Sequence, residues 1–209
     1  MLEVRVIVVM ARVPEPGKAK TRLIPRLGDK GAARLCAAMT GDVFDLVASI
    51  GVPWRVALAG DLRHPWVRTV PAEVEPQADG DLGARLTHAL RDGGVAIGTD
   101  APTLPRPMLQ EAHASTAEVV LAPAFDGGYV LVGVAEVAGV FDGVPWSAAD
   151  TFARQHARAV ALGRSVRVLP FWYDVDAPAD LDFLATHLAT LPLHTAPRTR
   201  EFLHALAPG

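Results

Sequence analysis

The sequence has almost no cysteine and no long hydrophobic run. Cys36 is the single cysteine among 209 residues, so no disulfide can form within the chain. This is typical of a protein in a reducing compartment, and we interpret the thiol as part of a helix core. No apolar run approaches the ~20 residues that a membrane span requires. The first run, Val6 to Ala11, is too short for a signal peptide. We therefore expect a cytoplasmic protein with no membrane partner.

A large excess of one charge is also missing. The net charge is −3, which argues against a broad basic surface and hence against a nucleic acid polymer as partner. Half of the residues are hydrophobic and 21% are charged, which excludes a disordered chain. Domains commonly span roughly 100–200 residues, so we expect one domain over residues 1–209.

The few lysines are concentrated in one segment. Lys18, Lys20 and Lys30 are the only lysines in the chain. Between Arg12 and Arg34, seven basic residues oppose two acidic ones, a local charge of +5. A charge run is usually a solvated surface. This run follows directly after the first predicted strand, which favours a binding role.

Apolar segments of strand and helix type alternate along the chain. Apolar, β-branched runs predict strands at Leu2–Met10, Arg55–Ala59, Val95–Gly98, Glu118–Ala122, Tyr129–Val134 and Ser165–Tyr173. Periodic spacing predicts helices at Ala32–Ile50, Asp81–Arg91, Pro105–Ser115, Ser147–Leu162 and Pro178–Leu191. This alternation predicts an α/β fold, with a mainly parallel sheet and helices on both faces.

Several local signals mark where helices begin. Asp29 is placed to cap the first helix, and Ser147 with Asp150 resembles a capping box. Pro178 suits a first helical position. The tail after Leu191 is expected to form a short helix at Thr199–Leu206 or to remain loose.

The loop Pro14–Leu23 predicts a phosphate site. It follows the first strand, at the edge of the sheet where open α/β folds bind ligands. If the loop is extended, Lys18, Lys20 and Arg22 point to one side and can cradle a polyphosphate beside free backbone N–H groups. A Walker A motif is excluded, because it would require glycine at Arg12 and a hydroxyl at Ala19.

Carboxylates follow two other predicted strands. Asp100 ends the run Val95–Asp100, while Asp174 and Asp176 follow the last strand. Magnesium in proteins is commonly bound by one or two carboxylates together with phosphate oxygens and water. Helix capping is the alternative role for each of these acids. We expect Asp100 to bind a metal together with one of the pair.

Asp126-Gly127-Gly128 precedes the strand Tyr129–Val134. Two glycines beside an acid allow the backbone to approach a ligand closely. The same residues make an ordinary hairpin turn, which their sequence alone favours.

Together these motifs resemble a known family. They are Pro-Glu-Pro-Gly-Lys-Ala-Lys-Thr-Arg-Leu at 14–23, Gly-Asp-Leu-Gly at 80–83, Gly-Thr-Asp-Ala-Pro at 98–102, Asp-Gly-Gly-Tyr at 126–129 and Asp-Val-Asp-Ala-Pro-Ala-Asp-Leu at 174–181. The order resembles the CofC-like "transferase 1" family (DUF2064), a branch of the GT-A nucleotide-diphospho-sugar transferases. Phospholactate guanylyltransferase and the molybdenum-cofactor guanylyltransferases are similar to it. The resemblance implies a three-layer α/β/α, Rossmann-like GT-A fold with a mixed sheet.

The resemblance also implies roles for individual residues. The residues matched to nucleotide binding are Arg12, Pro16, Gly17, Lys18, Lys20, Arg22, Gln77 and Gly83. Asp126, Gly127 and Gly128 match the acceptor side. Asp100 and Asp176, with Asp174 as the substitute for the latter, match the ligands of Mg²⁺ or Mn²⁺. The catalytic set is then Lys20, Arg22 and Asp100.

Three functions remain open at this point. Many glycosyltransferases of this fold carry an Asp-X-Asp metal motif, whereas Ala101-Pro102 follows Asp100 here. With the cationic loop, this favours Mg²⁺-dependent transfer of a nucleoside monophosphate from a nucleoside triphosphate to a small phosphorylated acceptor, with release of pyrophosphate. The alternative is a glycosyltransferase that uses a nucleotide-sugar donor. A non-catalytic nucleotide-binding module is the third.

Overall fold

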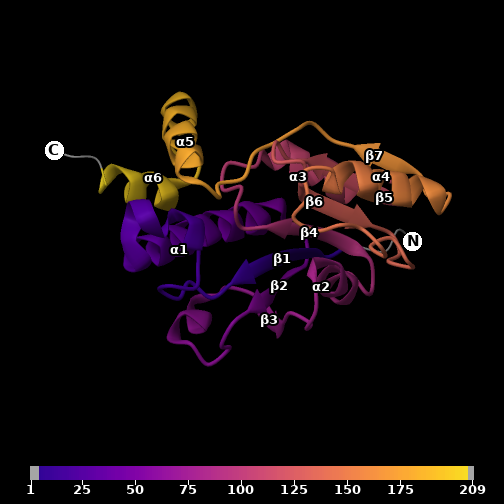
Figure 1. The fold of residues 1–209 in the computed structure, drawn as a ribbon, viewed down its shortest axis with the longest axis horizontal. Coiled ribbons are helices and arrows are strands. Elements are labelled where there is room, and N and C mark those ends of the chain that lie inside the picture. Colours follow the sequence, from indigo (N-terminus) through magenta and orange to yellow (C-terminus); the bar gives the residue numbers. More distant parts are fainter. Residues whose placement is uncertain (1–4, 207–209) are drawn as a thin grey trace.

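A seven-stranded sheet forms the centre of the computed structural model, which describes residues 5–206 (Figure 1). The strands are β1 (Ile7–Arg12), β2 (Trp54–Ala59), β3 (Glu73–Pro76), β4 (Gly94–Gly98), β5 (Val119–Pro123), β6 (Tyr129–Val134) and β7 (Val166–Val168). Their order in the sheet is β3-β2-β1-β4-β6-β5-β7, and β6 alone runs antiparallel to its neighbours. The predicted mainly parallel, mixed sheet is confirmed.

The pairing of β1 with β4 sets the position of the site. The two strands are parallel neighbours, and Met10 lies opposite Gly98. Their carboxyl ends therefore lie at the same edge of the sheet, and the loops that follow them meet there. β1 is fully buried from Ile7 to Val9, as expected of an apolar central strand with both faces covered.

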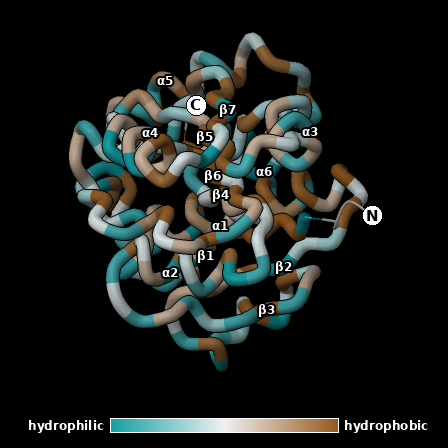
Figure 2. The backbone as a smooth tube through the Cα atoms, turned by 90° about the vertical axis from the view of Figure 1, so that its right-hand side faces the viewer, coloured by the Kyte–Doolittle hydropathy of each residue, from teal (hydrophilic) through white to brown (hydrophobic). Residues whose placement is uncertain are grey.

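Helices cover both faces of this sheet. They are α1 (Ile24–Ile50), α2 (Leu82–Ala89), α3 (Arg106–Ala114), α4 (Thr151–Ala161), α5 (Pro178–Thr190) and α6 (Pro197–His204). Side chains of α1 and α3 share one hydrophobic cluster with the sheet, and side chains of α2 and α4 share another on the opposite face. Figure 2 shows α2 and α4 on one side of the strands and α3 on the other. This is the predicted three-layer arrangement.

A third apolar cluster joins α5 and α6 to α1. It includes Leu35 and Met39 of α1, Leu184 of α5 and Phe202 of α6. The Asp42 carboxylate on α1 accepts hydrogen bonds from the first backbone N–H groups of α6, so this helix is anchored at its start. The C-terminal segment is therefore helical and packs against α1. The observed helix begins at Pro197, two residues before the expected start at Thr199.

Two predicted helix starts are wrong. The first helix begins at Ile24 with Pro25 in its first turn, and it is kinked where Gly28 has a φ of 68°. Asp29 therefore follows a kink inside the element. Before α4, Ser147 has a positive φ of 58°, and Asp150 bonds to the Arg154 side chain, so no capping box forms.

The sheet also differs from the prediction at its edges. β3 was not predicted, because its glutamates are typical of an exposed edge strand and resemble a loop in sequence. Of the predicted strand Ser165–Tyr173, only β7 forms as a strand, and Trp172 makes one isolated bridge to Ala124. In the first predicted strand, Leu2 to Val4 lie outside the described residues. None of the helices within residues 5–206 combines the length and the apolarity that a membrane crossing demands.

Candidate active site

A cavity of about 620 Å³ opens at the carboxyl ends of β1 and β4. This volume lies within the range of small-molecule sites, roughly 300–1,000 Å³. Its lining includes eight residues that the sequence predicted for binding or catalysis: Arg12, Lys18, Lys20, Arg22, Gln77, Asp100, Asp174 and Asp176. Residues as far apart in the chain as Arg12 and Asp176 therefore meet at one edge of the sheet.

The loop before α1 is folded back on itself, so the prediction of an extended strand of cations is wrong. The N–H groups of Lys18 and Ala19 both donate to the Glu15 carbonyl oxygen, which closes a tight turn. Lys20 then adopts left-handed backbone dihedrals, with a φ of 49°. A short 3-10 helix, Thr21–Leu23, follows. The three cations consequently differ in burial and in their partners, although all three line the cavity.

Lys20 points inward, to the carboxylates. Its Nζ lies 2.8 Å from Asp100 Oδ1 and 2.8 Å from Asp176 Oδ1, and it also donates to the Val175 carbonyl oxygen. Its side chain is only 6% exposed. Burial lowers the pKa of Lys20, but the two adjacent carboxylates raise it, and the net shift is upward. Lys20 is therefore a charged group that joins the segment after β4 to the segment before α5.

The backbone holds both of these carboxylates in place. The Val175 N–H donates to the Asp100 carbonyl oxygen, which joins the segment after β4 to the segment before α5. Asp180, in the first turn of α5, accepts hydrogen bonds from the backbone N–H groups of Asp176 and Ala177. Pro178 occupies the first helical position, as predicted. Capping of α5 thus belongs to Asp180, which leaves the Asp176 side chain to face the cavity.

Asp174 lies close to the same negative charges. Burial and the carboxylates of Asp126, Asp176 and Asp100 raise the pKa of Asp174 to about 6. Asp174 therefore adds a further acidic side chain to the cavity that Asp100 and Asp176 line.

Asp100 and Asp176 fit a hard divalent cation. Both already converge on a cation, the ammonium of Lys20, and the excess negative charge around them would be reduced by a second one. No group of three or more histidine, cysteine, aspartate or glutamate side chains within residues 5–206 is arranged to hold a metal ion alone. Two carboxylates completed by phosphate oxygens and water are a common magnesium arrangement.

Two exposed arginines lie on the same cavity. Arg12 ends β1 and has no ion-pair partner among the residues that the structure describes. Arg22 is 73% exposed and approaches Asp176 at 3.8 Å. Lys18 is also exposed and pairs with Glu15 of its own turn. The guanidinium groups are thus available to an anionic ligand.

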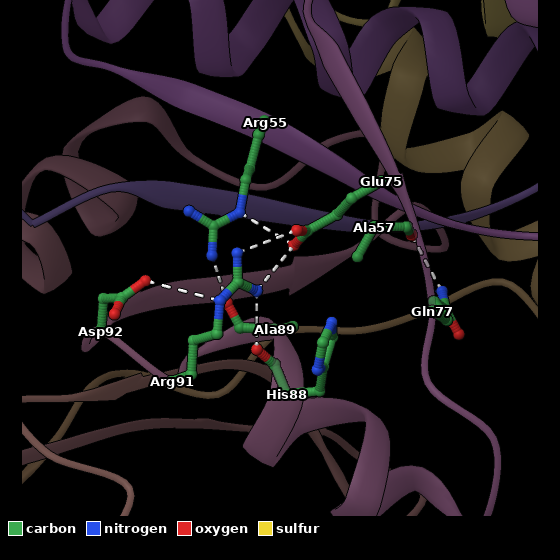
Figure 3. A network of polar contacts seen from close by, with 8 residues as sticks. All are labelled: Arg55, Ala57, Glu75, Gln77, His88, Ala89, Arg91 and Asp92. Atoms are coloured by element: carbon green, nitrogen blue, oxygen red, sulfur yellow. Dashed lines mark hydrogen bonds and ion pairs between the residues drawn. The ribbon is translucent and has the colours of Figure 1, made fainter.

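Gln77 is fixed beside β1 and β2. Its Nε2 donates to the carbonyl oxygens of Ala11 and Ala57, so the amide oxygen is left for a ligand. Figure 3 shows how the neighbouring network holds this region, with Glu75 of β3 between the guanidinium groups of Arg55 and Arg91.

Six predicted site residues do not line the cavity: Pro16, Gly17, Gly83, Asp126, Gly127 and Gly128. Gly83 lies in the first turn of α2, where an added Cβ would come within 2.9 Å of the Trp146 side chain. Asp126 to Gly128 form the turn between β5 and β6, as their sequence favours, and Asp126 Oδ1 accepts from the Gly128 N–H.

Tyr129 and Cys36 are among the lining residues that the sequence reasoning did not assign to the site. Tyr129 lines the cavity as the first residue of β6, and burial raises the pKa of its hydroxyl. Cys36 is buried in α1, as predicted, yet it also contributes to the cavity. Burial raises the pKa of this thiol, which opposes a nucleophilic role. Tyr129 belongs to the quoted motif at 126–129, so its place beside the turn was the available signal.

Solved structures share this architecture. A candidate nucleotide-diphospho-sugar transferase from Desulfovibrio desulfuricans G20 superposes with a TM-score of 0.88 at 28% identity, over 96% of this chain and 94% of that one. A nucleotidyl transferase from Methanothermobacter thermautotrophicus superposes with a TM-score of 0.59 at 13% identity, over 89% and 98%. A manganese complex of the Rv0371C protein of Mycobacterium tuberculosis H37Rv superposes with a TM-score of 0.50 at 18% identity, over 86% and 97%.

These similarities confirm the predicted fold and the predicted transferase class. The closer similarity to phospholactate guanylyltransferase stays a prediction. No protein of curated function matches the chain in sequence. The model of the family described as "Uncharacterized protein conserved in bacteria (DUF2064)" matches residues 43–148, just over half of the chain, and the chain therefore belongs to this family.

Proposed function

We propose that the protein is a Mg²⁺- or Mn²⁺-dependent nucleotidyltransferase. It moves a nucleoside monophosphate from a nucleoside triphosphate to a small phosphorylated acceptor and releases pyrophosphate. One observation carries the proposal: exposed arginines and converging carboxylates line the same cavity at the carboxyl edge of a parallel sheet. The nucleotidyl transferase among the structural neighbours is consistent with it.

The donor binds on the β1 and β2 side of the cavity. Arg12 and Arg22 donate to the phosphate oxygens through planar guanidinium groups, which suit bidentate contacts. Gln77, held by two backbone carbonyl groups, presents its amide oxygen toward the base or the ribose. Neither Pro16, Gly17 nor Gly83 is needed for this arrangement.

Asp100 and Asp176 would hold the divalent cation, with Asp174 as the nearest additional carboxylate. When bound, the cation supplies charge neutralisation at the phosphate oxygens. Lys20 is a positioning residue in this scheme, because its ammonium sets the spacing of the two carboxylates.

The transfer itself needs no covalent intermediate with the protein. A phosphate oxygen of the acceptor forms a bond to the α-phosphorus, and the bond from that phosphorus to the β-phosphate oxygen breaks. Pyrophosphate leaves with the bonding electron pair. The chain contributes positioning and charge stabilisation through its arginines and through the fixed carboxylates. A small acceptor, without a nucleic acid polymer or a membrane, and a cytoplasmic location belong to the same proposal.

Glycosyl transfer from a nucleotide-sugar is the second candidate. It is favoured by the 28% identical relative named for nucleotide-diphospho-sugar transfer. The loop geometry also weakens the argument for a triphosphate, because Lys20 is paired with carboxylates and is not free to bind phosphate. The remaining cations suit a diphosphate as well as a triphosphate.

One experiment separates the two candidates. Each nucleoside triphosphate, with phosphorylated acceptors and Mg²⁺, is assayed for pyrophosphate, and each nucleotide-sugar is assayed for released nucleoside diphosphate. The proposal expects pyrophosphate that requires both an acceptor and the metal. Acceptor-dependent release of nucleoside diphosphate, with no pyrophosphate from any triphosphate, would establish the glycosyltransferase instead.

Asp100→Asn tests the metal site, with Asp92→Asn as a matched control. Asp100 follows the carboxyl end of β4, whereas Asp92 precedes its amino end and, within residues 5–206, pairs only with Arg91, at 3.6 Å. Asp100→Asn is expected to abolish Mg²⁺-dependent thermal stabilisation by the nucleotide, and Asp92→Asn is expected to retain it. If both variants retain the Mg²⁺-dependent stabilisation equally, Asp100 has only a structural role.

A further inference from the structure

Two phenylalanine rings are stacked on the surface near the cavity. Phe125 is 73% exposed and Phe171 is 57% exposed, and their ring centroids lie 6.0 Å apart with an interplanar angle of 15°. Large aromatic side chains are usually buried, and an exposed apolar patch often marks a binding site. We call these two rings the phenylalanine pair.

The backbone beneath the pair is firmly held. The Trp172 N–H donates to the Pro123 carbonyl oxygen, and the bridge between Ala124 and Trp172 joins the two segments. On its other side, the turn packs against the segment before α4. A Cβ on Gly127 would come within 2.0 Å of the Ala149 carbonyl oxygen. The rings are therefore presented by a fixed scaffold, which lowers the entropic cost of binding a ligand on them.

The pair adjoins the carboxylate end of the cavity. β5 and β7 run parallel to β4, because the antiparallel β6 lies between β4 and β5. Phe125, which follows β5, and Phe171, which follows β7, therefore lie at the same edge of the sheet as the cavity. Tyr129, the first residue of β6 and four residues after Phe125, lines the cavity. Gln77 lies at the opposite end of the site, beside β2. A ligand bound at the arginines and Gln77 leaves the phenylalanine end for the second substrate.

We propose that the phenylalanine pair is the acceptor subsite and binds an acceptor that carries a ring with a flat apolar face. This inference rests on the proposed function and names the class of its second substrate. Stacking on aromatic faces suits such a ring. Hydroxyl groups at the edge of the ring can donate to the neighbouring carboxylates.

Two other occupants fit the surface less well. Two phenylalanine rings offer at most about 150–250 Å² each, far less than the roughly 800 Å² per partner of a stable protein interface. An anionic membrane surface would be repelled by Asp126 and Asp174 beside the rings. A small ring-bearing ligand matches both the area and the charge.

The test measures binding of phosphorylated probes by saturation-transfer NMR and by titration, with Mg²⁺ present. Glucose 1-phosphate offers a saturated ring, phenyl phosphate offers an aromatic one, and glycerol 3-phosphate has no ring. The wild-type chain is compared with a Phe125→Ala, Phe171→Ala double variant. Leu193→Ala is the control, because this side chain is 80% exposed and lies on the connection between α5 and α6.

At least one ring-bearing probe is expected to bind the wild-type chain more tightly than glycerol 3-phosphate does. The double variant should lose about tenfold in affinity for that probe, the scale of stacking on an aromatic side chain. The Leu193 control should lose none. The two ring probes identify whether the ring is saturated or aromatic.

Three results would overturn the inference. The double variant could bind the ring probes as tightly as the wild-type chain does, neither ring probe could bind, or glycerol 3-phosphate could bind as tightly as the ring probes. If the wild-type chain dimerises or binds vesicles and the double variant does not, the pair belongs to a contact with another macromolecule, and the inference is overturned as well. Thermal stabilisation by nucleoside triphosphates is recorded for every variant. Its absence from the wild-type chain would contradict the proposed function while leaving the result on ring binding intact.

Discussion

Replacement of Lys20 by methionine tests the central feature of the site. The change keeps the length of the side chain and removes an ammonium group that contacts Asp100, Asp176 and the Val175 carbonyl oxygen. A lysine that reached out to bind phosphate would leave the stability of the free protein unchanged, which is what the sequence alone predicts. In the structure, its removal takes away the ammonium group that bridges two carboxylates, and Asp176 keeps only the exposed Arg22 guanidinium, at 3.8 Å, among the residues that the structure describes.

The expected loss follows from the burial of the three groups. Breaking a buried ion pair by removing one partner costs about 3–5 kcal/mol. The carboxylates of Asp100 and Asp176 are 44% and 39% exposed, so water screens part of their charge. We therefore expect the free energy of unfolding to fall by about 1–3 kcal/mol. For a chain of this size, this corresponds to a melting temperature lower by about 3–10 °C.

The assay is thermal unfolding with and without MgCl₂, against NaCl of equal ionic strength. Lys18→Met is the matched control, because the Lys18 ammonium is exposed and, in the described part of the chain, pairs only with Glu15, at 2.9 Å. It should lose less than about 1 kcal/mol. Mg²⁺ should stabilise Lys20→Met more than the wild-type chain, since it can bind the carboxylates that the ammonium has left. Equal melting temperatures for the two variants, or rescue by NaCl alone, would refute the reasoning.

Three further predictions concern other parts of the chain. Arg22→Gln should weaken nucleotide binding by about 1.5–3 kcal/mol, the scale of a hydrogen bond to a charged group, and leave the melting temperature unchanged; unaltered affinity by calorimetry would contradict this. Hydrogen bonds from an arginine and from a backbone N–H lower the pKa of Glu118 below its ordinary 4.5. Its stabilisation is therefore present above that pH and lost as the pH falls through the folded pKa, so the wild-type chain and Glu118→Gln should differ in melting temperature at pH 7 and converge at low pH. Gly127→Ala should destabilise the protein far more than Gly17→Ala, which costs about 1 kcal/mol for its positive φ alone. Of these two glycines, only Gly127 would bring an added Cβ against backbone atoms, so equal losses of stability in urea unfolding would contradict the tight packing.

The sequence by itself determined the elements and much of the chemistry. Apolar runs and helical periodicity located six of the seven strands and five of the six helices of the described chain, because burial imposes those patterns directly on the residues. The last helix, α6, was one of two alternatives for the tail. The acids and bases after strands also followed from sequence, since parallel strands bring their carboxyl ends to one edge. Asp100 and the basic loop could therefore be assigned to one site from sequence, whereas Arg12 and Gln77 were assigned to it by the resemblance to the family.

The tertiary structure decided which charges face each other. The direction of Lys20 depends on a left-handed backbone and a tight turn, and no sequence pattern distinguishes these from an extended loop. The pairing of Lys20 with Asp100 and Asp176 joins residues 80 and 156 positions apart, and only the closed fold brings them together. The same holds for the stacked rings of Phe125 and Phe171, because a bridge between distant segments places them side by side. Local patterns encode burial, whereas the orientation of a polar side chain depends on the packing of the whole chain around it.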